Sequence, residues 1–176
     1  IDRVVFARET SLQTIQKAEE NAIETEVFVH GALCVSVSGL CTLSSFRGGR
    51  SGNRGRCAQA CREQYEYKGK KAAWLSTRDI CDFDALDAIK EANISSLKIE
   101  GRLKRPEYVA CVTGVYKRKL NSSLNVDEQQ QAQHSLLQIF NRGSFSHGHL
   151  LGGEDAAIMY PWHVSHEGVP IGRGTK

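Results

Sequence analysis

The chain has 176 residues, of which 40% are hydrophobic and 24% charged, with a formal net charge of +3. This composition is typical of a folded globular domain and excludes a disordered chain, and the small net charge does not by itself indicate nucleic acid as a partner. No apolar run approaches the roughly 20 residues needed to span a bilayer, and the start has no signal-like pattern, so we expect a soluble, cytoplasmic protein without a membrane partner. Because the chain opens on Ile1 and runs directly into a strand-like segment, we expect a fragment of a longer protein.

The first hundred residues predict strands and helices in alternation. The strands are expected at 2–8, 25–30, 73–76 and 96–100, and the helices at 11–22 and 83–92. Such alternation is the pattern of a parallel α/β fold.

The pattern changes after residue 102. Pro106 opens a segment whose apolar residues recur at helical spacing up to Leu120, which predicts a packing helix. A polar stretch, 121–133, is expected to be a linker that runs into another helix at 129–140. The remainder, 143–176, is rich in glycine and histidine and predicts turns.

The predicted strand at 96–100 carries charged and apolar residues on opposite faces. Alternation places Lys98, Glu100 and Arg102 on one side and Leu97 and Ile99 on the other. Charges on one face of a covered sheet need partners, and the carboxyl ends of barrel strands are where active sites form. The alternative is an edge strand whose charges face water.

Basic residues gather in a glycine-rich stretch at 47–71. They are Arg47, Arg50, Arg54, Arg56, Arg62, Lys68, Lys70 and Lys71. Guanidinium groups in such a loop could hold phosphates or a carboxylated small molecule. A solvated basic loop is the alternative.

Four cysteines, Cys34, Cys41, Cys57 and Cys61, lie in a region whose glycines are Gly31, Gly39, Gly48, Gly49, Gly52 and Gly55. Irregular, glycine-rich backbone lets a chain wrap around a metal centre, and the spacing favours an iron-sulfur cluster over zinc, whose sites usually take two short cysteine pairs. Unligated thiols or disulfides remain open. Cys81 is a candidate fifth ligand, whereas Cys111 lies on an apolar helix face and is expected to pack in the core.

Several sequence blocks resemble the signature of the peptidase U32 family, known as collagenase-like proteases. The central block runs Glu26-Val-Phe28-Val-His30-Gly31-Ala32-Leu33-Cys34 and continues as Ser38-Gly39-Leu-Cys41-Thr-Leu43-Ser44. The flanking blocks are Ala7-Arg8-Glu9-Thr10-Ser11-Leu12, Asn53-Arg54-Gly55-Arg56-Cys57-Ala-Gln-Ala-Cys61-Arg62 and Ser96-Leu97-Lys98-Ile99-Glu100-Gly101-Arg102.

The resemblance implies the C-terminal part of a TIM-barrel-like domain. Residues 1–104 would form the partial barrel with a cysteine-rich insertion at 30–65, residues 105–142 the packing helices and linker, and residues 143–176 an extension that leads into a further, absent region. The missing partner would then be the N-terminal half of the same barrel. The segment Phe140-Asn141-Arg142-Gly143, with His147-Gly148-His149-Leu150-Leu151-Gly152, resembles longer members associated with ribosomal RNA modification.

The resemblance also implies an enzyme, because some members hydroxylate a ribosomal RNA cytidine, a tRNA uridine or a ubiquinone precursor without oxygen. Some carry a 4Fe-4S cluster, which here would use Cys34, Cys41 and Cys57 with Cys61 or Cys81 as the fourth ligand. We therefore expect RNA as substrate. Peptide-bond hydrolysis and a structural cluster in an RNA-binding module are the alternatives, although no Ser-His-Asp or His-Glu-x-x-His pattern is visible in the sequence.

Roles for other residues follow as expectations. Arg54, Arg56 and Arg102 would hold an anionic group, either RNA phosphate or a carboxylated hydroxyl donor such as prephenate. His30, Lys98 and Glu100 are the candidate catalytic residues, which would orient groups or move protons. Each of them has an alternative role as a structural ion-pair partner.

Overall fold

A computed structural model describes residues 1–18, 23–102, 104–152 and 158–161. The strands are β1 (Arg3–Val5), β2 (Glu24–Ala32), β3 (Tyr65–Tyr67), β4 (Lys70–Ala72), β5 (Asp79–Cys81), β6 (Ser96–Glu100) and β7 (Phe145–Ser146). The α-helices are α1 (Leu12–Ala18), α2 (Leu43–Gly48), α3 (Leu86–Glu91), α4 (Pro106–Asn121) and α5 (Val126–Gln138), with 3-10 turns η2 (Val37–Gly39), η3 (Gly52–Arg54) and η4 (Ala60–Arg62).

The main sheet has five strands built around β2. β1 and β6 pair with β2 in parallel, whereas β5 pairs with it antiparallel and β7 runs parallel to β5. Glu26 pairs with both β1 and β6, and His30 with both β5 and β6, so β1 and β5 follow one another along the same edge of β2. The sheet is therefore mixed, which corrects the parallel sheet expected from the sequence, and the described residues form no closed barrel.

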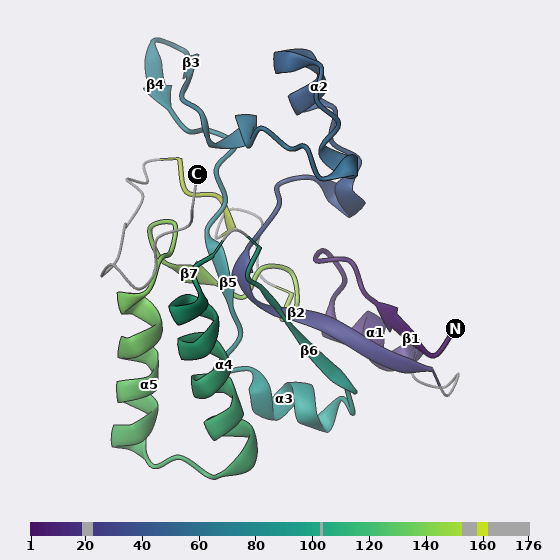
Figure 1. Ribbon diagram of the computed structural model, residues 1–176, viewed down its shortest axis with the longest axis vertical. Coiled ribbons are helices and arrows are strands. Elements are labelled where there is room, and N and C mark those ends of the chain that lie inside the picture. Colours follow the sequence, from purple (N-terminus) through teal and green to yellow (C-terminus); the bar gives the residue numbers. More distant parts are fainter. Residues whose placement is uncertain (19–22, 103, 153–157, 162–176) are drawn as a thin grey trace.

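One face of the sheet is covered by helices. Val27 and Val29 of β2 point into a core shared with α1, α3, α4 and α5, and Leu97 and Ile99 of β6 pack against it. Figure 1 shows α4 and α5 as an antiparallel pair beside the sheet. The hydrophobic spacing predicted from Pro106 to Leu120 is thus confirmed, with Tyr108, Val112, Val115 and Tyr116 buried.

Two predicted elements differ from the structure. Residues 73–76 form a turn rather than a strand, and the strand of this region is β5, three residues later. The polar linker is shorter than expected because Asn125 and Glu128 form a capping box that begins α5 at Val126. The predicted helix at 11–22 is described as far as Ala18, and most of the predicted extension at 143–176 lies outside the described residues.

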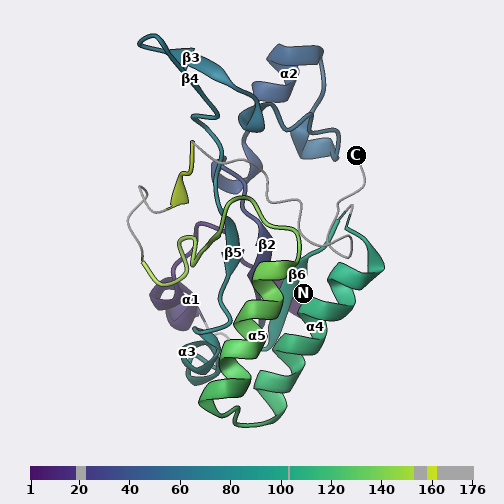
Figure 2. The same cartoon turned by 90° about the vertical axis from the view of Figure 1, so that its left-hand side faces the viewer.

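Residues 34–76, here called the cysteine arm, leave the sheet at the end of β2 and return just before β5. The arm carries α2 and the β3–β4 hairpin, and both views place these two elements away from α3, α4 and α5 (Figures 1 and 2). None of the described helices is both long enough and apolar enough to cross a bilayer.

Candidate functional site

Residues that end or follow three parallel strands come together near the start of the cysteine arm. Arg8 follows β1, Cys34 follows β2, and Glu100 ends β6. The Arg8 guanidinium donates to the Glu100 carboxylate at 3.0 Å and lies 4.1 Å above the ring of Phe28. Charged side chains from separate strands thus converge where α/β folds place their active sites.

Gly31 allows β2 and β6 to approach closely at this end. Its φ of +108° is strained for any residue with a side chain, and an added Cβ would lie 2.5 Å from the carbonyl oxygen of Glu100. A side chain at this position would push Glu100 away from Arg8. The glycine is therefore a requirement of the site geometry.

Arg102 joins the strand end to the cysteine arm. Its backbone N–H donates to Glu100 at 3.1 Å, and its guanidinium donates to the carbonyl of Gly55 at 2.9 Å. Arg54 and Arg56, on either side of Gly55, have exposed side chains. The Arg102 guanidinium thus contacts the backbone between Arg54 and Arg56, and a common anion site for the three arginines stays a prediction.

The face of β6 that carries charges has partners, as expected. Lys98 donates to Glu26 at 2.7 Å, which lowers the pKa of that carboxyl, and the Lys98 ammonium lies 5.6 Å from the centre of the Phe28 ring. Glu26 also accepts from Ser96 and pairs with Arg3. Lys98 therefore belongs to an ion-pair network, two residues before Glu100 on the same face of β6.

The cysteine thiols of the arm are partly open to solvent, with Cys34 and Cys57 exposed and Cys41 and Cys61 half-buried. The sulfur of Cys34 accepts the backbone N–H of Ser36 at 3.5 Å. The sulfur of Cys57 accepts that of Gln59 at 3.3 Å and the hydroxyl of Ser44 at 3.7 Å. Hydrogen bonds of this kind stabilise the negative charge of a thiolate.

The four thiols of the arm share one electrostatic environment. Burial raises the pKa of the Cys61 thiol, Arg62 opposes this rise, and Cys34, Cys57 and Cys41 add to it. Among the described residues, no three His, Cys, Asp or Glu side chains lie close enough together to hold a single metal ion. The described residues therefore do not form a ready-made site for a single metal ion.

Arg62 closes the base of the arm, a role that the sequence did not reveal. Its guanidinium donates to the carbonyl of Leu33 and to the carbonyl of Thr77, both at 2.6 Å. It also donates to the hydroxyls of Ser76 and Thr77, at 3.0 and 2.9 Å. The half-buried Arg62 thus connects Leu33, which precedes Cys34, to Ser76 and Thr77, where the chain returns into β5.

Cys81 and His30 lie on the helix-covered side of the sheet. Burial raises the pKa of Cys81 to about 11, and its sulfur accepts from the Tyr116 hydroxyl at 3.8 Å. The His30 ring is enclosed by Tyr108, Tyr116 and Phe145, and burial lowers its pKa to about 3. These placements keep both side chains away from the arginines of the arm.

Cys111 packs against the same core from α4, as its position on an apolar face predicted.

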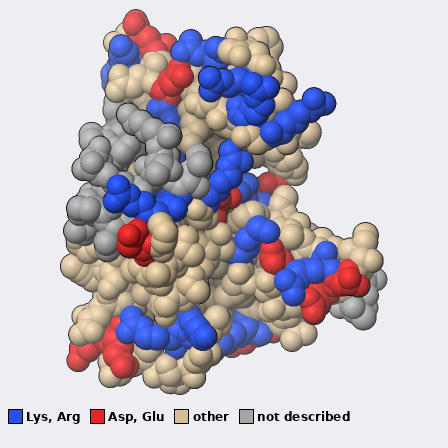
Figure 3. Space-filling view, viewed as in Figure 1, with Lys and Arg blue, Asp and Glu red and all other residues tan. Residues whose placement is uncertain are grey.

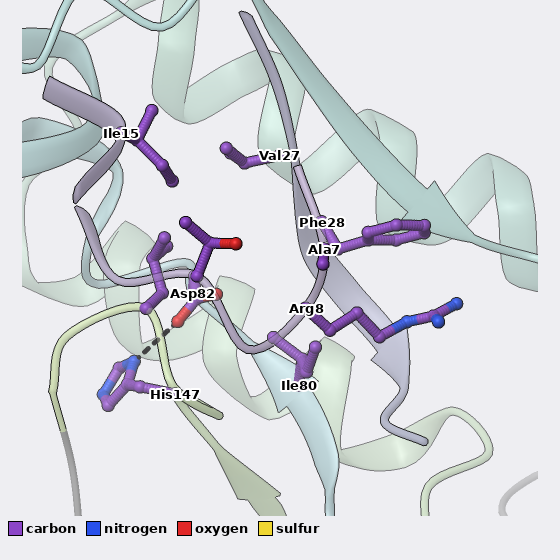
Figure 4. A pocket seen from close by; sticks show the side chains of 10 residues that line it. Ala7, Arg8, Ile15, Val27, Phe28, Ile80, Asp82 and His147 are labelled. Carbon is purple, nitrogen blue, oxygen red and sulfur yellow. Dashed lines mark hydrogen bonds and ion pairs between the residues drawn. The ribbon is translucent and has the colours of Figure 1, made fainter. Parts of the chain in front are cut away.

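A second polar pair lies behind the strand ends. His147 Nδ1 is 2.9 Å from Asp82 Oδ1, and Asp82 is fully buried directly after β5 (Figure 4). Burial raises the pKa of Asp82 to about 6, and the hydrogen bond to Asp82 raises the pKa of His147. A cavity of about 10 Å³, the room of one water molecule, adjoins the pair and is also lined by Arg8.

Arg8, Arg62 and Asp82 are the residues of the region that sequence reasoning had not singled out as site residues. Arg8 stands directly after a predicted strand, so the rule that active sites form at the carboxyl ends of strands would have found it. The roles of Arg62 and Asp82 depend on contacts with residues far away in the sequence, and no local pattern marks them.

Comparison with known proteins places these features in a family. Residues 1–159 match peptidase family U32. The tRNA hydroxylation protein P1 of Bacillus subtilis (strain 168) is 40% identical over 69% of the chain and 32% of the relative, and the 23S rRNA 5-hydroxycytidine C2501 synthase of Escherichia coli (strain K12) is 40% identical over 68% and 20%. A collagenase of Porphyromonas gingivalis (strain ATCC BAA-308 / W83) is 31% identical over 99% of the chain and 49% of the relative.

The chain spans half or less of the length of these relatives, and no solved structure matches it. The match over residues 1–159 covers the strand ends, the cysteine arm and the helices α4 and α5. The chain therefore belongs to peptidase family U32.

Proposed function

We propose that this chain carries the cluster-binding part of an enzyme that hydroxylates an RNA base without oxygen. The observation that carries the proposal is the position of the cysteine arm, which begins at Cys34 directly after β2 and contacts the end of β6 where Arg102 donates to Gly55, two residues before Cys57. Arg8 and Glu100 form an ion pair at the same strand end. Relatives named for tRNA hydroxylation and for 5-hydroxycytidine synthesis in 23S rRNA support RNA as the substrate.

The donor set of the arm fits a 4Fe-4S cluster. Two of its sulfurs already accept backbone N–H groups, as thiolate ligands of clusters do. When bound, such a cluster supplies single electrons or a Lewis-acidic iron.

Cys61 is our choice for the fourth ligand. It shares the environment of Cys34, Cys41 and Cys57, whereas Cys81 faces Tyr116 in the helix-covered core. Arg62 holds the chain next to both Cys61 and Cys34, so ligands at the two ends of the arm are fixed by one side chain.

The chain's own residues around the thiols supply binding and orientation. Arg54, Arg56 and Arg102 offer guanidinium groups for RNA phosphate or for a carboxylated hydroxyl donor such as prephenate. Arg8 and the Arg102 backbone N–H hold the two oxygens of the Glu100 carboxylate, and Lys98 holds Glu26. His30 is neutral in the core and supports the site through packing.

The test combines metal analysis with nucleoside analysis. Protein prepared without oxygen should be brown and contain iron and sulfide, and Cys57→Ala should lose both the colour and the hydroxylated nucleoside in RNA from a complemented strain. Cys111→Ser, on α4, is the matched control and should keep both. A colourless protein with stoichiometric zinc, or full RNA hydroxylation by Cys57→Ala, would contradict the proposal.

A second candidate function is peptide-bond hydrolysis, which the relatives named collagenase favour. It predicts that the protein cleaves gelatin and that a chelator or Cys41→Ala abolishes the cleavage. Gelatin left intact by the active, cluster-loaded protein would remove this candidate.

A further inference from the structure

Two large aromatic side chains of the cysteine arm are exposed to solvent. Phe46 on α2 is 86% exposed, and Tyr67 on the β3–β4 hairpin is 59% exposed. Single exposed apolar residues are common on protein surfaces, but an aromatic ring on each of two projecting elements is a feature of binding surfaces. Figures 1 and 2 show α2 and the hairpin projecting at the same end of the molecule.

Positive charge is concentrated on the same arm. Residues 34–76 hold eight Lys and Arg against two Glu, a formal charge of +6, whereas the rest of the chain holds fifteen against eighteen, a charge of −3. Seven of the eight cations are exposed: Arg47, Arg50, Arg54, Arg56, Lys68, Lys70 and Lys71. Figure 3 shows Lys and Arg gathered over this end of the molecule.

We propose that the cysteine arm is a binding surface for single-stranded RNA, on which Phe46 and Tyr67 stack against unpaired bases. The inference rests on the proposed function, which makes RNA the substrate. Exposed rings interleaved with cations form the surface that binds single strands, because every base offers a flat face and every phosphate a negative charge. A duplex hides its base faces and would leave both rings unused.

The surface adjoins the cysteines. Cys41 lies two residues before α2 begins, and Ser44 of α2 donates to the Cys57 sulfur at 3.7 Å. Phe46 is one half-turn further along the same helix. A base stacked on Phe46 would therefore lie across α2 from Ser44, about one helix diameter (~10 Å) from the side of the helix that contacts Cys57.

Lys68 lies 5.3 Å from the centre of the Tyr67 ring, and Trp74 meets that ring edge to face at 6.1 Å between centroids. Contact with Trp74 restricts the Tyr67 ring before binding, so a base that stacks on it would cost less side-chain entropy. The hairpin presents an ordered ring beside a cation rather than a freely rotating side chain.

The experiment measures binding of a fluorescent, unstructured RNA oligonucleotide to the protein, with the same sequence as a duplex for comparison. We expect the single strand to bind more tightly than the duplex, with affinity falling steeply as salt is raised. Phe46→Ala and Phe46→Leu should both weaken binding by about 5- to 150-fold, since both remove the ring. Arg50→Glu should weaken binding and reduce the salt dependence, whereas Lys117→Glu, an exposed cation on α4, should change affinity less than about twofold.

The Phe46→Leu variant separates stacking from apolar packing. If it binds RNA like the wild type while Phe46→Ala does not, the ring does not stack and the proposal is wrong. The proposal is also wrong if all variants bind RNA equally, or if single strand and duplex bind with equal affinity. The exposed rings would then be a binding surface for a protein partner.

Failure of the proposed function gives a different result. Cys57→Ala should retain RNA affinity while losing the cluster, so loss of hydroxylation with intact, arm-dependent RNA binding would refute the hydroxylase and keep the RNA surface. If hydroxylation is normal and the arm variants bind RNA like the wild type, the RNA-binding surface is refuted and the hydroxylase is kept.

Discussion

Individual buried charges decide how the strand ends are arranged. Asp82 is fully buried, with Oδ1 bonded to His147 and Oδ2 without a hydrogen-bond partner among the described residues. A carboxylate in this setting is costly unless His147 carries a proton or the carboxyl itself does. The pair therefore favours one shared proton, and it attaches the segment after β7 to the end of β5.

Asp82→Asn tests this pair through the titration of His147. Loss of the carboxylate should lower the pKa of His147 toward its ordinary value near 6.5, as measured by NMR of the ring protons. Folding raises the pKa of both Asp82 and His147. The stability that proton binding by these two groups contributes is therefore complete below their unfolded-state pKa values and is lost as the pH rises through their folded-state pKa values.

Wild-type protein should therefore gain stability relative to Asp82→Asn when the pH falls from about 8 to 4. A stability difference that is independent of pH, together with an unchanged His147 pKa, would show that the pair is not coupled. Asp87→Asn, an exposed carboxylate on α3, is the control and should leave the pKa of His147 unchanged.

At the scale of elements, the arm is fixed to the sheet mainly by its base. Arg62 makes four hydrogen bonds to Leu33, Ser76 and Thr77, and the Thr77 hydroxyl also donates to Leu33 at 2.7 Å. Buried residues within the arm are few and small, such as Ser44 and Ala60. Closure of the arm therefore depends on polar contacts rather than on a core of its own.

Arg62→Lys should loosen the arm without unfolding the sheet. A single ammonium does not reproduce the fork of a guanidinium, so carbonyls of Leu33 and Thr77 lose donors, and Arg62→Ala should lose more. Hydrogen exchange should increase in residues 34–76 and stay unchanged in α4. Equal protection of the arm in wild type and Arg62→Ala would refute this role.

Two glycines give opposite predictions. Gly31→Ala should destabilise the protein by about 2 kcal/mol or more, because its Cβ collides with Glu100 and its φ is positive. Gly114→Ala in α4 meets no atom within 4 Å and should stabilise the protein by about 1 kcal/mol through helix propensity. Urea unfolding measures both, and a neutral Gly31→Ala would show that β2 and β6 need not approach so closely.

The sequence predicted those elements whose pattern is local. β6 and α4 were predicted because alternation in Ser96–Glu100 and helical spacing after Pro106 follow directly from burial of one face. β5 was placed at 73–76 because Ala73, Trp74 and Leu75 are apolar, although Ala73 begins a turn. The antiparallel direction of β5 and the hydrogen bonds of Arg62 depend on contacts between residues far apart in the sequence, which periodicity does not predict.

At the scale of the whole molecule, the core is a helix-covered face that includes one neutral histidine. His30 lies 1% exposed among Tyr108, Tyr116 and Phe145, and its Nε2 has no hydrogen-bond partner among the described residues. Protonation would place a charge in the centre of the domain. His30 belongs to the family-like sequence block, so the sequence favoured a role in chemistry beside the structural alternative, and its catalytic role stays a prediction.

Acid should therefore destabilise the fold through His30. Because burial lowers its folded-state pKa to about 3, the unfolded chain takes up the proton between pH 6.5 and 3, and stability falls by several kcal/mol across that window as the pH falls. His30→Gln should be less stable at neutral pH but should show a shallower decline. Denaturant unfolding at several pH values measures this, and parallel declines in the two proteins would contradict it.

The closed base of the arm has a consequence for how relatives of this protein can diverge. The strands β2 and β5 require only that Leu33 and Thr77 are held together, and closing a longer loop between them costs little extra entropy. Apart from Arg62, the residues between these two anchors can increase or decrease in number or change in sequence without disturbing strand register. The arm is therefore an insertion that can vary while the sheet stays constant, so the fold can accept different arms at little cost in stability.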